Sequence, residues 1–498
     1  MTVRPAAILL CAALCAAGTA RADDEQRPAE EQKVAPSAFE KAEPEPVMHW
    51  GEGDGRSYWI PLVDIVFYEA LQNLFNRTVV GGTDYDTNWG TFRDNVRGRW
   101  VFDNDPFVIN QAGHPYQGSL YHTFARSAGI GYWGSLGYAL FGSLLWETAG
   151  ETTPPSINDQ FTTAFGGSFF GETLFRLSSL TLERGHAAPG FWRELAAAFI
   201  SPATGFNRLA YGSRFDGVFR SRDPAVYTRW QLGANLNASV QSNVDLSTTT
   251  GGSPVPQGYD RGEVISDFTV AYGLPGKPEY RYDRPFDYFD FQFTAASSNA
   301  LENVVARGLL AGSGYGAGSS YRGVWGLFGT YDYIAPQIFR ISSTGLAAGN
   351  VGQWWLSRTT ALQSEVLLGA GYASAGIVQG RDERDYHHGI APQGMVALRL
   401  ILNDRAALDL TGSDWYVTDR ASEESGGSEN IARGHAGLTV RVHGLHGVTL
   451  RYTFSQREAD YVGERGTRQS VGAVSLAYTY LGHRWFGAVD WRPEAQDK

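Results

Sequence analysis

Cysteine is almost absent from this chain of 498 residues: it occurs twice, as Cys11 and Cys15, both close to the N-terminus. They fall inside residues 1–22, which have the basic start, the apolar stretch and the Ala-Arg-Ala cleavage site of a secretory signal peptide. We expect the mature chain to begin at Asp23 without any cysteine. Disulfide bonds and thiolate metal sites are then excluded.

Long hydrophobic runs are also lacking. After the signal peptide, no stretch of about 20 strongly hydrophobic residues is left to anchor the chain in the inner membrane. Basic residues are in the minority, with 41 lysines and arginines against 52 acidic residues and a net charge of −11, which argues against nucleic acid as a partner. P-loop, dinucleotide-binding and nucleophile-elbow motifs are missing too, so we expect no cofactor.

Glycine and aromatic residues are abundant instead: the chain has 60 glycines, and aromatic residues make up 13% of it. An exported chain of this composition without a membrane helix indicates an outer-membrane β-barrel. From residue 225 onward, apolar and polar residues alternate, as in Leu232, Ala234 and Leu236 against Asn235 and Asn237. This period of two predicts strands with one face toward lipid and the other toward a wet lumen.

Segments of this kind predict an antiparallel barrel of about 12 strands over residues 225–491. In the C-terminal half, short and long connections alternate, as in barrels with short periplasmic turns and long outer loops. With an even strand number, both barrel ends lie on the periplasmic side. His387 and His388 fall in one of the long outer loops, and the aromatic residues near the C-terminus extend the expected last strand to Trp491. A large soluble β-sandwich is the alternative.

Two other regions precede the barrel. Residues 23–49 form an acidic, proline-containing segment with little apolar content, which we expect to be a disordered linker. Residues 50–219 have a helical period, in which Val63, Phe67 and Leu71, for example, recur on one face. We therefore expect an α+β protein in which a glycine-rich helical domain serves as a plug or a periplasmic cap for the barrel.

Small residues form two ladders in the helical region. They recur at every fourth position from Ser127 to Ser143, and again from Thr163 to Gly171. This spacing puts them on one face of a helix, where another backbone can approach closely. We expect the two ladders to pack face to face as a helical hairpin.

Four short motifs lie in the same region: His-Pro-Tyr-Gln-Gly-Ser from His114, Ser-Leu-Leu-Trp-Glu from Ser143, Pro-Pro-Ser-Ile-Asn-Asp from Pro154 and Gly-Gly-Ser-Phe-Phe-Gly-Glu from Gly166. Together they resemble an uncharacterised bacterial family of exported proteins, which is catalogued as a domain of unknown function. The resemblance covers roughly residues 102–215. It implies a domain boundary and a location in the envelope of Gram-negative bacteria. It implies no chemistry, because the family has no established activity.

The helical region also holds the candidate catalytic residues, His114, His122, Glu147, Glu151 and Asp159. Glu147 and Glu151 are one helical turn apart and share a face. With His114 or His122 opposite them, they could bind a divalent metal or act as a general base. The spacing matches no known ligand motif. In the alternative interpretation, both glutamates pair with arginines, and Asp159 belongs to a capping box with Ser156.

A plug would use a second set of residues. Glu172 and Arg176 are one turn apart and are expected to form a structural ion pair, while Arg126 is a further partner for the glutamates. The charges of a plug would meet lumen residues such as Arg229 and Asp267. An aromatic surface for an apolar ligand would come from Tyr132, Trp133 and Trp146.

These observations favour a non-enzymatic outer-membrane barrel that moves or holds an apolar, lipid-like molecule of the envelope. Outer-membrane lipid is the expected partner, and the acidic linker would offer a docking site to a periplasmic protein. One alternative is a lipid-acting hydrolase that uses the histidines and the acidic residues of the helical region. A purely structural envelope protein is the other.

Overall fold

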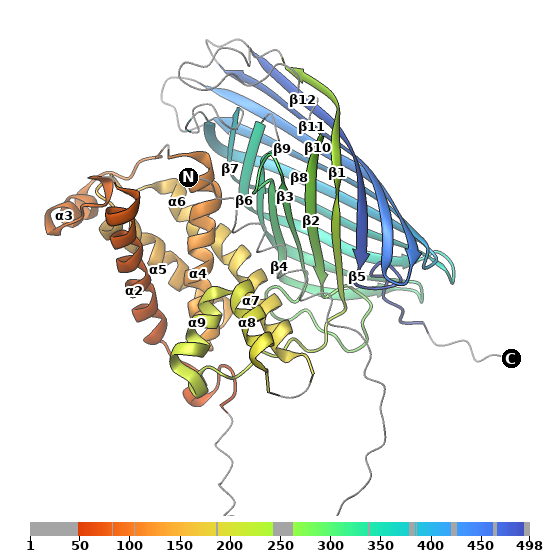
Figure 1. The fold of residues 1–498 in the computed structure, drawn as a ribbon, viewed down its shortest axis with the longest axis horizontal. Coiled ribbons are helices and arrows are strands. Elements are labelled where there is room, and N and C mark those ends of the chain that lie inside the picture. The colour runs from red at the N-terminus through yellow and green to blue at the C-terminus, as the bar shows by residue number, and fades with distance from the viewer. Residues whose placement is uncertain are drawn as a thin grey trace, which may run out of the picture.

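The computed structural model places two parts side by side, a helical domain and a β-barrel (Figure 1). This confirms the α+β class predicted from the sequence, with the helices first and the barrel second. The expected signal peptide and nearly all of the expected linker lie outside the residues that the structure describes. The described residues are 48–81, 83–103, 105–185, 188–242, 262–336, 339–377, 384, 386–419, 426–461 and 466–492.

Twelve antiparallel strands close into a barrel, in which each strand pairs with its neighbours in sequence and β1 pairs with β12. The predicted strand number is confirmed, and the sandwich alternative is wrong. The connections after β4, β6, β8 and β10 are short, and we call this edge the short-turn end of the barrel. The strands are β1 (Val226–Ser242), β2 (Gly262–Tyr272), β3 (Phe289–Ala296), β4 (Asn303–Ala317), β5 (Tyr321–Ile334), β6 (Phe339–Trp355), β7 (Thr360–Ile377), β8 (Tyr386–Leu402), β9 (Ala406–Asp419), β10 (Gly427–His443), β11 (His446–Tyr461) and β12 (Thr467–Leu481).

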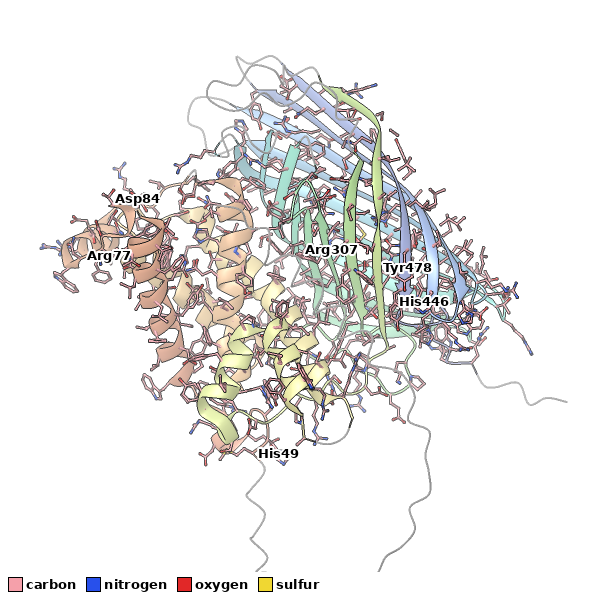
Figure 2. All side chains as sticks on the ribbon, viewed as in Figure 1. His49, Arg77, Asp84, Arg307, His446 and Tyr478 are labelled. Atoms are coloured by element: carbon pink, nitrogen blue, oxygen red, sulfur yellow. The ribbon has the colours of Figure 1, made fainter. Side chains whose placement is uncertain are left out.

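The two faces of the strands differ as the alternation predicts. Leu236 and its outward neighbours are exposed, whereas Gln231 is buried in the lumen, where its Nε2 donates to Thr449 Oγ1 at 2.8 Å. On the outer wall near the short-turn end, His446 Nδ1 lies 2.6 Å from Tyr478 Oη (Figure 2). Aromatic residues at this level are typical of the interfacial girdle of transmembrane barrels.

The segment after β12 does not extend the last strand to Trp491, as was expected. It turns inward after Leu481 and closes the short-turn end. The carbonyl oxygen of Val489 accepts hydrogen bonds from Gln353 Nε2 at 2.6 Å and from Trp355 Nε1 at 3.0 Å. The turn depends on Gly487, whose φ of +85° is unfavourable for residues with a side chain.

Several α-helices of the helical domain continue into, or begin from, a wider π-helical turn. The turns η2 (Asn76–Val80), η4 (Ile109–Gly113), η5 (Trp146–Gly150) and η6 (Gln160–Gly166) adjoin α2, α4, α5 and α7, respectively. Among the described residues, no helix has both the length and the apolar character needed to cross a membrane. The helices are α2 (Ile60–Phe75), α3 (Trp89–Arg97), α4 (His114–Ser127), α5 (Tyr132–Leu145), α6 (Ile157–Asp159), α7 (Gly167–Glu183), α8 (Phe191–Ile200) and α9 (Pro202–Tyr211).

Helix α4 packs closely against η6 and α7. A Cβ on Gly118 would lie 1.7 Å from the carbonyl oxygen of Thr163, and one on Gly167 would lie 2.7 Å from the Cα of Gly118. The second predicted ladder of small residues therefore packs most closely against α4, although the first ladder was expected as its partner; α5, which carries most of the first ladder, contacts η6 as well. The first ladder is split, because α4 ends at Ser127 and α5 begins only at Tyr132.

The helical domain lies against the outer wall of the barrel. Phe170 of α7 stacks on Phe291 of β3 with 6.1 Å between ring centroids, and it also contacts Tyr331 of β5. Phe291 points away from the lumen, whereas its neighbour Gln292 faces it. This placement differs from both a plug in the lumen and a cap below the barrel. The reason is that the outward aromatic residues of β2–β5 offer the helices an apolar surface, while the charged lumen residues pair among themselves.

Contacts between the two parts run along the barrel from one end toward the other. Near the long-loop end, Asn110 Nδ2 donates to Tyr386 Oη of β8 at 2.9 Å. Toward the short-turn end, Arg176 Nη1 donates to Asp287 Oδ1 at 3.1 Å, in the loop between β2 and β3. The helical domain therefore lies beside the strands over much of their length.

His387 and His388 belong to β8, although a long outer loop was expected there. His388 is buried on the outer wall, where its Nδ1 lies 2.9 Å from Ser374 Oγ. Its ring faces Phe102 of the helical domain at 6.2 Å. Polar residues at the start of a strand look like loop residues in the sequence. The contact that buries His388 comes from Phe102, which lies far away along the chain.

Candidate functional site

A fully buried carboxylate, Glu172 of α7, lies at the centre of the helical domain. Arg126 of α4 binds both of its oxygens, with Nε–Oε2 at 2.6 Å and Nη2–Oε1 at 3.0 Å. Arg176 donates from Nε to Oε1 at 2.8 Å, and His122 Nε2 lies 3.2 Å from Oε2. We call these four residues the Glu172 cluster. The expected Glu172–Arg176 ion pair is present, and α4 adds two partners to it.

Helix geometry and small residues bring the cluster together. His122 and Arg126 are one turn apart on α4, and Glu172 and Arg176 are one turn apart on α7, so each helix presents two polar side chains on one face. The helices approach closely at Gly171, where a Cβ would lie 2.9 Å from a backbone oxygen of α4. A bulkier residue there would move the carboxylate away from its partners.

The electrostatics of the cluster favour an ionised glutamate. Burial alone would raise the pKa of Glu172, but Arg126, the His122 hydrogen bond and Arg176 together hold it well below its ordinary value. Burial also lowers the pKa of His122, which favours a neutral imidazole. The Arg126 guanidinium lies over the ring of Phe175 at 4.5 Å, so aromatic faces add to its stabilisation.

The second guanidinium of the cluster ties it to the barrel. Arg176 donates from Nη1 to Asp287 Oδ1 at 3.1 Å and from Nη2 to the carbonyl oxygen of Pro285 at 2.5 Å. Asp287 also binds Arg222 at 2.8 Å and the backbone nitrogen of Arg284 at 2.8 Å. Sequence reasoning missed Asp287, because it lies 111 residues after Arg176 and no local pattern distinguishes it from other loop acids.

A second group of ionisable residues lies nearer the long-loop end. Glu147 Oε2 accepts from the backbone nitrogen of Ser156 at 2.7 Å, and Ser156 Oγ accepts from the Asp159 nitrogen at 3.2 Å. Ser156 therefore caps α6 as expected, but Glu147 makes the reciprocal bond that was assigned to Asp159. The Asp159 carboxylate lies 3.7 Å from His114 Nε2 instead. We call Glu147 and Asp159 the acid pair.

The acid pair is sealed from solvent and favours neutral carboxyl groups. Burial raises the pKa of Glu147 well above its ordinary value, and the nearby Asp159 raises it further. Burial likewise raises the pKa of Asp159. Glu147 is 4% exposed and Asp159 is 2% exposed, so water does not reach the pair freely.

Asparagine side chains connect this region to the barrel wall. Asp103 Oδ1 accepts from Asn158 Nδ2 at 2.5 Å and from Asn110 Nδ2 at 2.7 Å. Tyr386 of β8 donates from Oη to the carbonyl oxygen of Asp105 at 2.7 Å. The polar residues around the acid pair therefore help to position the helical domain on β8.

The five candidate catalytic residues do not form one site. His122 joins the Glu172 cluster, whereas His114 joins Asp159. Glu151 accepts from Trp146 Nε1 at 2.8 Å, and neither Glu147 nor Glu151 contacts Arg126 or Arg176 as the alternative interpretation had proposed. In the described ranges, no group of three or more His, Cys, Asp and Glu residues is arranged to hold a metal.

The aromatic candidates differ in their surroundings. Tyr132 is buried and lies edge-on to His122 at 5.3 Å, and Trp146 is buried as well. Trp133 is exposed on α5. Of the two lumen residues expected to meet a plug, Arg229 instead binds Asp409 of β9 at 3.0 Å, because the helical domain does not enter the lumen.

A third polar group was missed by sequence reasoning. Tyr121 Oη donates to Glu69 Oε1, and Gln117 Nε2 donates to Tyr121 Oη at 2.5 Å. Burial raises the pKa of Glu69 to about 8. The signal was present in the sequence, since Glu69 lies opposite the apolar face of α2. In the structure that face points outward, and Glu69 points inward.

Replacing Glu147 with glutamine is expected to preserve the fold and to stabilise the protein at high pH. The folded-state pKa of Glu147 lies above its value in the unfolded chain. Its contribution to stability is therefore complete below the unfolded pKa and is lost as pH rises toward the folded pKa. Glutamine resembles the neutral acid at every pH. Between the unfolded and the folded pKa of Glu147, the free energy of unfolding of Glu147→Gln should therefore rise relative to that of wild type by up to about 1.4 kcal/mol per pH unit.

Urea unfolding of wild type and Glu147→Gln at about pH 5 and about pH 9 measures this advantage. Glu52→Gln is the control, because Glu52 is exposed. A difference between wild type and Glu147→Gln that stays constant between the two pH values would show that Glu147 is ionised in the folded protein.

The fold defines the class of the protein before any comparison is made. A closed antiparallel barrel with an apolar outer wall and a charged lumen is the architecture of transmembrane β-barrels. Residues 99–203 match the family model described as a domain of unknown function, DUF3943. This match confirms the resemblance drawn from the four motifs. It includes the whole Glu172 cluster and the acid pair.

Comparison with other proteins gives distant similarities. No curated protein matches the chain. The outer membrane channel DcaP of Acinetobacter baumannii is 6% identical over 51% of this chain and 96% of that chain, with a TM-score of 0.22. The Pseudomonas putida toluene transporter TodX is 11% identical over 53% and 90%, with a TM-score of 0.20. The translocator domain of the autotransporter NalP from Neisseria meningitidis is 13% identical over 51% and 87%, with a TM-score of 0.19.

Proposed function

We propose that this protein is an outer-membrane β-barrel that carries its helical domain beside the barrel in contact with lipid. We further propose that it holds or moves a lipid-like envelope molecule along this shared surface. One observation carries the proposal: the outer helices have the reverse polarity of helices in a water-soluble domain, with polar residues inside and apolar residues outside.

Helix α2 has this reversed polarity. Its buried side includes Asp64 and Glu69, which are 3% and 6% exposed. A helix on the surface of a soluble domain turns its apolar side inward and its charges outward. In contact with lipid, exposed apolar side chains carry no free-energy cost, so this arrangement is not required. The exposed side of α2 consists of Val63, Val66, Phe67, Ala70, Leu71, Leu74 and Phe75.

Helix α5 has the same organisation. Its buried side carries Ser135 and Ser143, both almost completely inaccessible. Its exposed positions include no polar or charged side chain. They are Trp133, Gly134, Gly137, Leu140, Phe141 and Leu144.

The interior of the domain supports the same conclusion. Arg126, Glu172 and Arg176 are buried and compensate one another. In Figure 1, α4 and α7 lie between α2 and the barrel, so these charges are shielded on both sides. Buried, mutually paired charges with an apolar exterior are expected for a protein surrounded by lipid.

The apolar surface continues onto the barrel wall. Outward residues that the helices do not cover, such as Leu368, Ile390 and Leu450, are exposed and apolar. The lumen is lined by charged residues such as Arg229 and Asp267, so it is a poor route for an apolar molecule. A lipid-like molecule would instead move along the outside, where the helical domain meets the strands.

Fluorescence quenching tests the contact with lipid. A cysteine is introduced at Leu71 of α2 in a chain whose own cysteines lie in the expected signal peptide, and it carries a fluorescent dye. The protein is reconstituted into vesicles with brominated acyl chains. We expect strong quenching of this dye, similar to that of a dye at Leu450 on the barrel wall, because both positions are exposed and apolar.

Asp94 on α3 is the matched control, since it is exposed and polar. A dye at this position should be quenched weakly. If the dye at Leu71 is quenched as weakly as the dye at Asp94, while the dye at Leu450 is quenched strongly, the helical domain does not contact lipid and the proposal is wrong.

A further inference from the structure

Most charges in the upper half of the barrel lumen, toward the long loops, are sorted by wall; the exception is Arg307 of β4, which pairs with Asp332 of β5 at 2.9 Å. Acidic side chains come from β2 and from the residue just before β4, and basic side chains come from β10 and β11. These strands are not neighbours in the barrel, so the two sets face each other across the lumen. The acidic wall carries Glu263, Asp267 and Glu302, and the basic wall carries the guanidinium groups of Arg433 and Arg451, with the imidazole of His435 beside them.

The ion pairs across the lumen are open. Arg433 Nη2 lies 3.7 Å from Glu302 Oε1, and Arg451 Nη1 lies 3.8 Å from Asp267 Oδ2. Both distances are longer than a hydrogen bond. In contrast, Arg399 and Asp409, on neighbouring strands, are 2.6 Å apart. The charges that face each other across the lumen therefore attract each other without forming hydrogen bonds.

One buried donor remains without an acceptor on the basic wall. Arg433 Nη1 is shielded from solvent and makes no hydrogen bond within the part of the chain that the structure describes. A buried charged donor of this kind is costly unless a bound molecule accepts from it.

A cavity lies between the two walls. Its volume is about 110 Å³, and the five charged residues of the two walls line it together with His435. This is room for on the order of eight water molecules, or for one small organic molecule. A neighbouring cavity of about 170 Å³ extends toward the short-turn end, and Arg307 lines both cavities. Arg307 is labelled among the strands in Figure 2. The closing C-terminal segment lies beyond the second cavity.

We infer that the upper cavity binds a small zwitterion of amino-acid size. Its carboxylate would accept hydrogen bonds from Arg433 and Arg451, and its ammonium group would donate to Glu302 and Asp267. A molecule with only one charge satisfies one wall and leaves the other uncompensated, so the site discriminates against simple anions and simple cations. The inference concerns the lumen and is independent of lipid contact by the helical domain.

Calorimetric titration of the purified full-length protein in nanodiscs tests this inference. The probes are L-serine as the zwitterion, acetate and ethylammonium as its two charged halves, and glycerol as a neutral molecule of similar size. We expect L-serine to bind at least about tenfold more tightly than acetate or ethylammonium, and glycerol to show no binding. Equal affinities for L-serine and acetate would reduce the site to an anion site and overturn the inference, as would undetectable binding of L-serine.

Variants locate the site. Arg433→Gln should weaken L-serine binding by about tenfold or more. Arg399→Gln is the matched control, because Arg399 borders only the second cavity, and it should leave the affinity unchanged. The exchanged pair Arg433→Glu with Glu302→Arg keeps both charges in the cavity and should restore binding. Heat-modifiable gel mobility confirms that each variant forms a barrel. An intact exchanged variant that fails to bind L-serine would contradict the inference.

Discussion

Replacing Glu172 with glutamine is expected to unfold the helical domain while the barrel stays closed. Glu172 is the one carboxylate that contacts both Arg126 and Arg176 among the described residues. Glutamine would leave Arg126 buried in an apolar interior with a neutral partner, whereas Arg176 would keep its ion pair with Asp287. Removing one member of a buried ion pair costs about 3–5 kcal/mol, which is a large part of the stability of a typical domain.

Trypsin digestion followed by mass spectrometry measures this effect. Arg126 and Arg176 are buried in the native protein, so cleavage after them reports local unfolding. We expect both cleavages in Glu172→Gln and neither in wild type, with the heat-modifiable mobility of the barrel unchanged. Glu52→Gln is the control for the same chemical change at an exposed position. Resistance of Glu172→Gln to trypsin would show that the cluster does not stabilise the domain.

Acidification should weaken the same cluster. Since the folded-state pKa of Glu172 is lowered, its contribution to stability is present above the unfolded value and is lost as pH falls toward the folded value. Hydrogen exchange of α4 and α7 at falling pH, measured by mass spectrometry because trypsin is inactive in acid, is therefore expected to show wild type approaching the behaviour of Glu172→Gln, whose own protection should change little.

The second large effect is expected from Gly118→Ala. A Cβ at this position would lie 1.7 Å from the carbonyl oxygen and 2.6 Å from the carbonyl carbon of Thr163, and backbone atoms cannot rotate away as a flexible side chain can. The helices α4 and α7 must then separate, which also pulls Arg126 away from Glu172. Overpacking of this kind costs about 1–3 kcal/mol and occasionally more.

Gly137→Ala is the matched control for this prediction. The same methyl group at Gly137 of α5 meets no other atom within 4 Å, and alanine is a better helix former than glycine by about 0.5–1 kcal/mol. Urea unfolding should therefore show Gly118→Ala destabilised and Gly137→Ala slightly stabilised. Equal effects of the two substitutions would mean that the close contact between α4 and η6 is not rigid.

The barrel could be predicted from the sequence because a strand of period two leaves its signature along the chain. Leu232 and Leu236 against Asn235 show which residues face outward and which face the lumen. The ion pair of Glu172 and Arg176 could be predicted for the same reason, since both residues lie on one helix. In each case the spacing of residues within one strand or one helix was sufficient to predict the contact or the exposed face.

The position of the helical domain could not be predicted in this way. Phe291 and Phe293 are apolar and point outward, and such residues look the same whether lipid or a helix covers them. The capture of Asp287 by Arg176 depends on a contact between distant segments. Val63 and Phe67 revealed a helix, but a helical period does not say whether water or lipid lies on the apolar side.

Photo-crosslinking in intact outer membranes tests the central claim, that the helical domain lies beside the barrel wall. The crosslinking amino acid benzoylphenylalanine replaces Phe161, which is partly exposed and stacks on Tyr372 of β7 at 5.8 Å between ring centroids. The structure predicts crosslinks to the β7 peptide that contains Tyr372, together with adducts to lipid. Crosslinks to lumen residues or to periplasmic proteins, with none to β7, would contradict it.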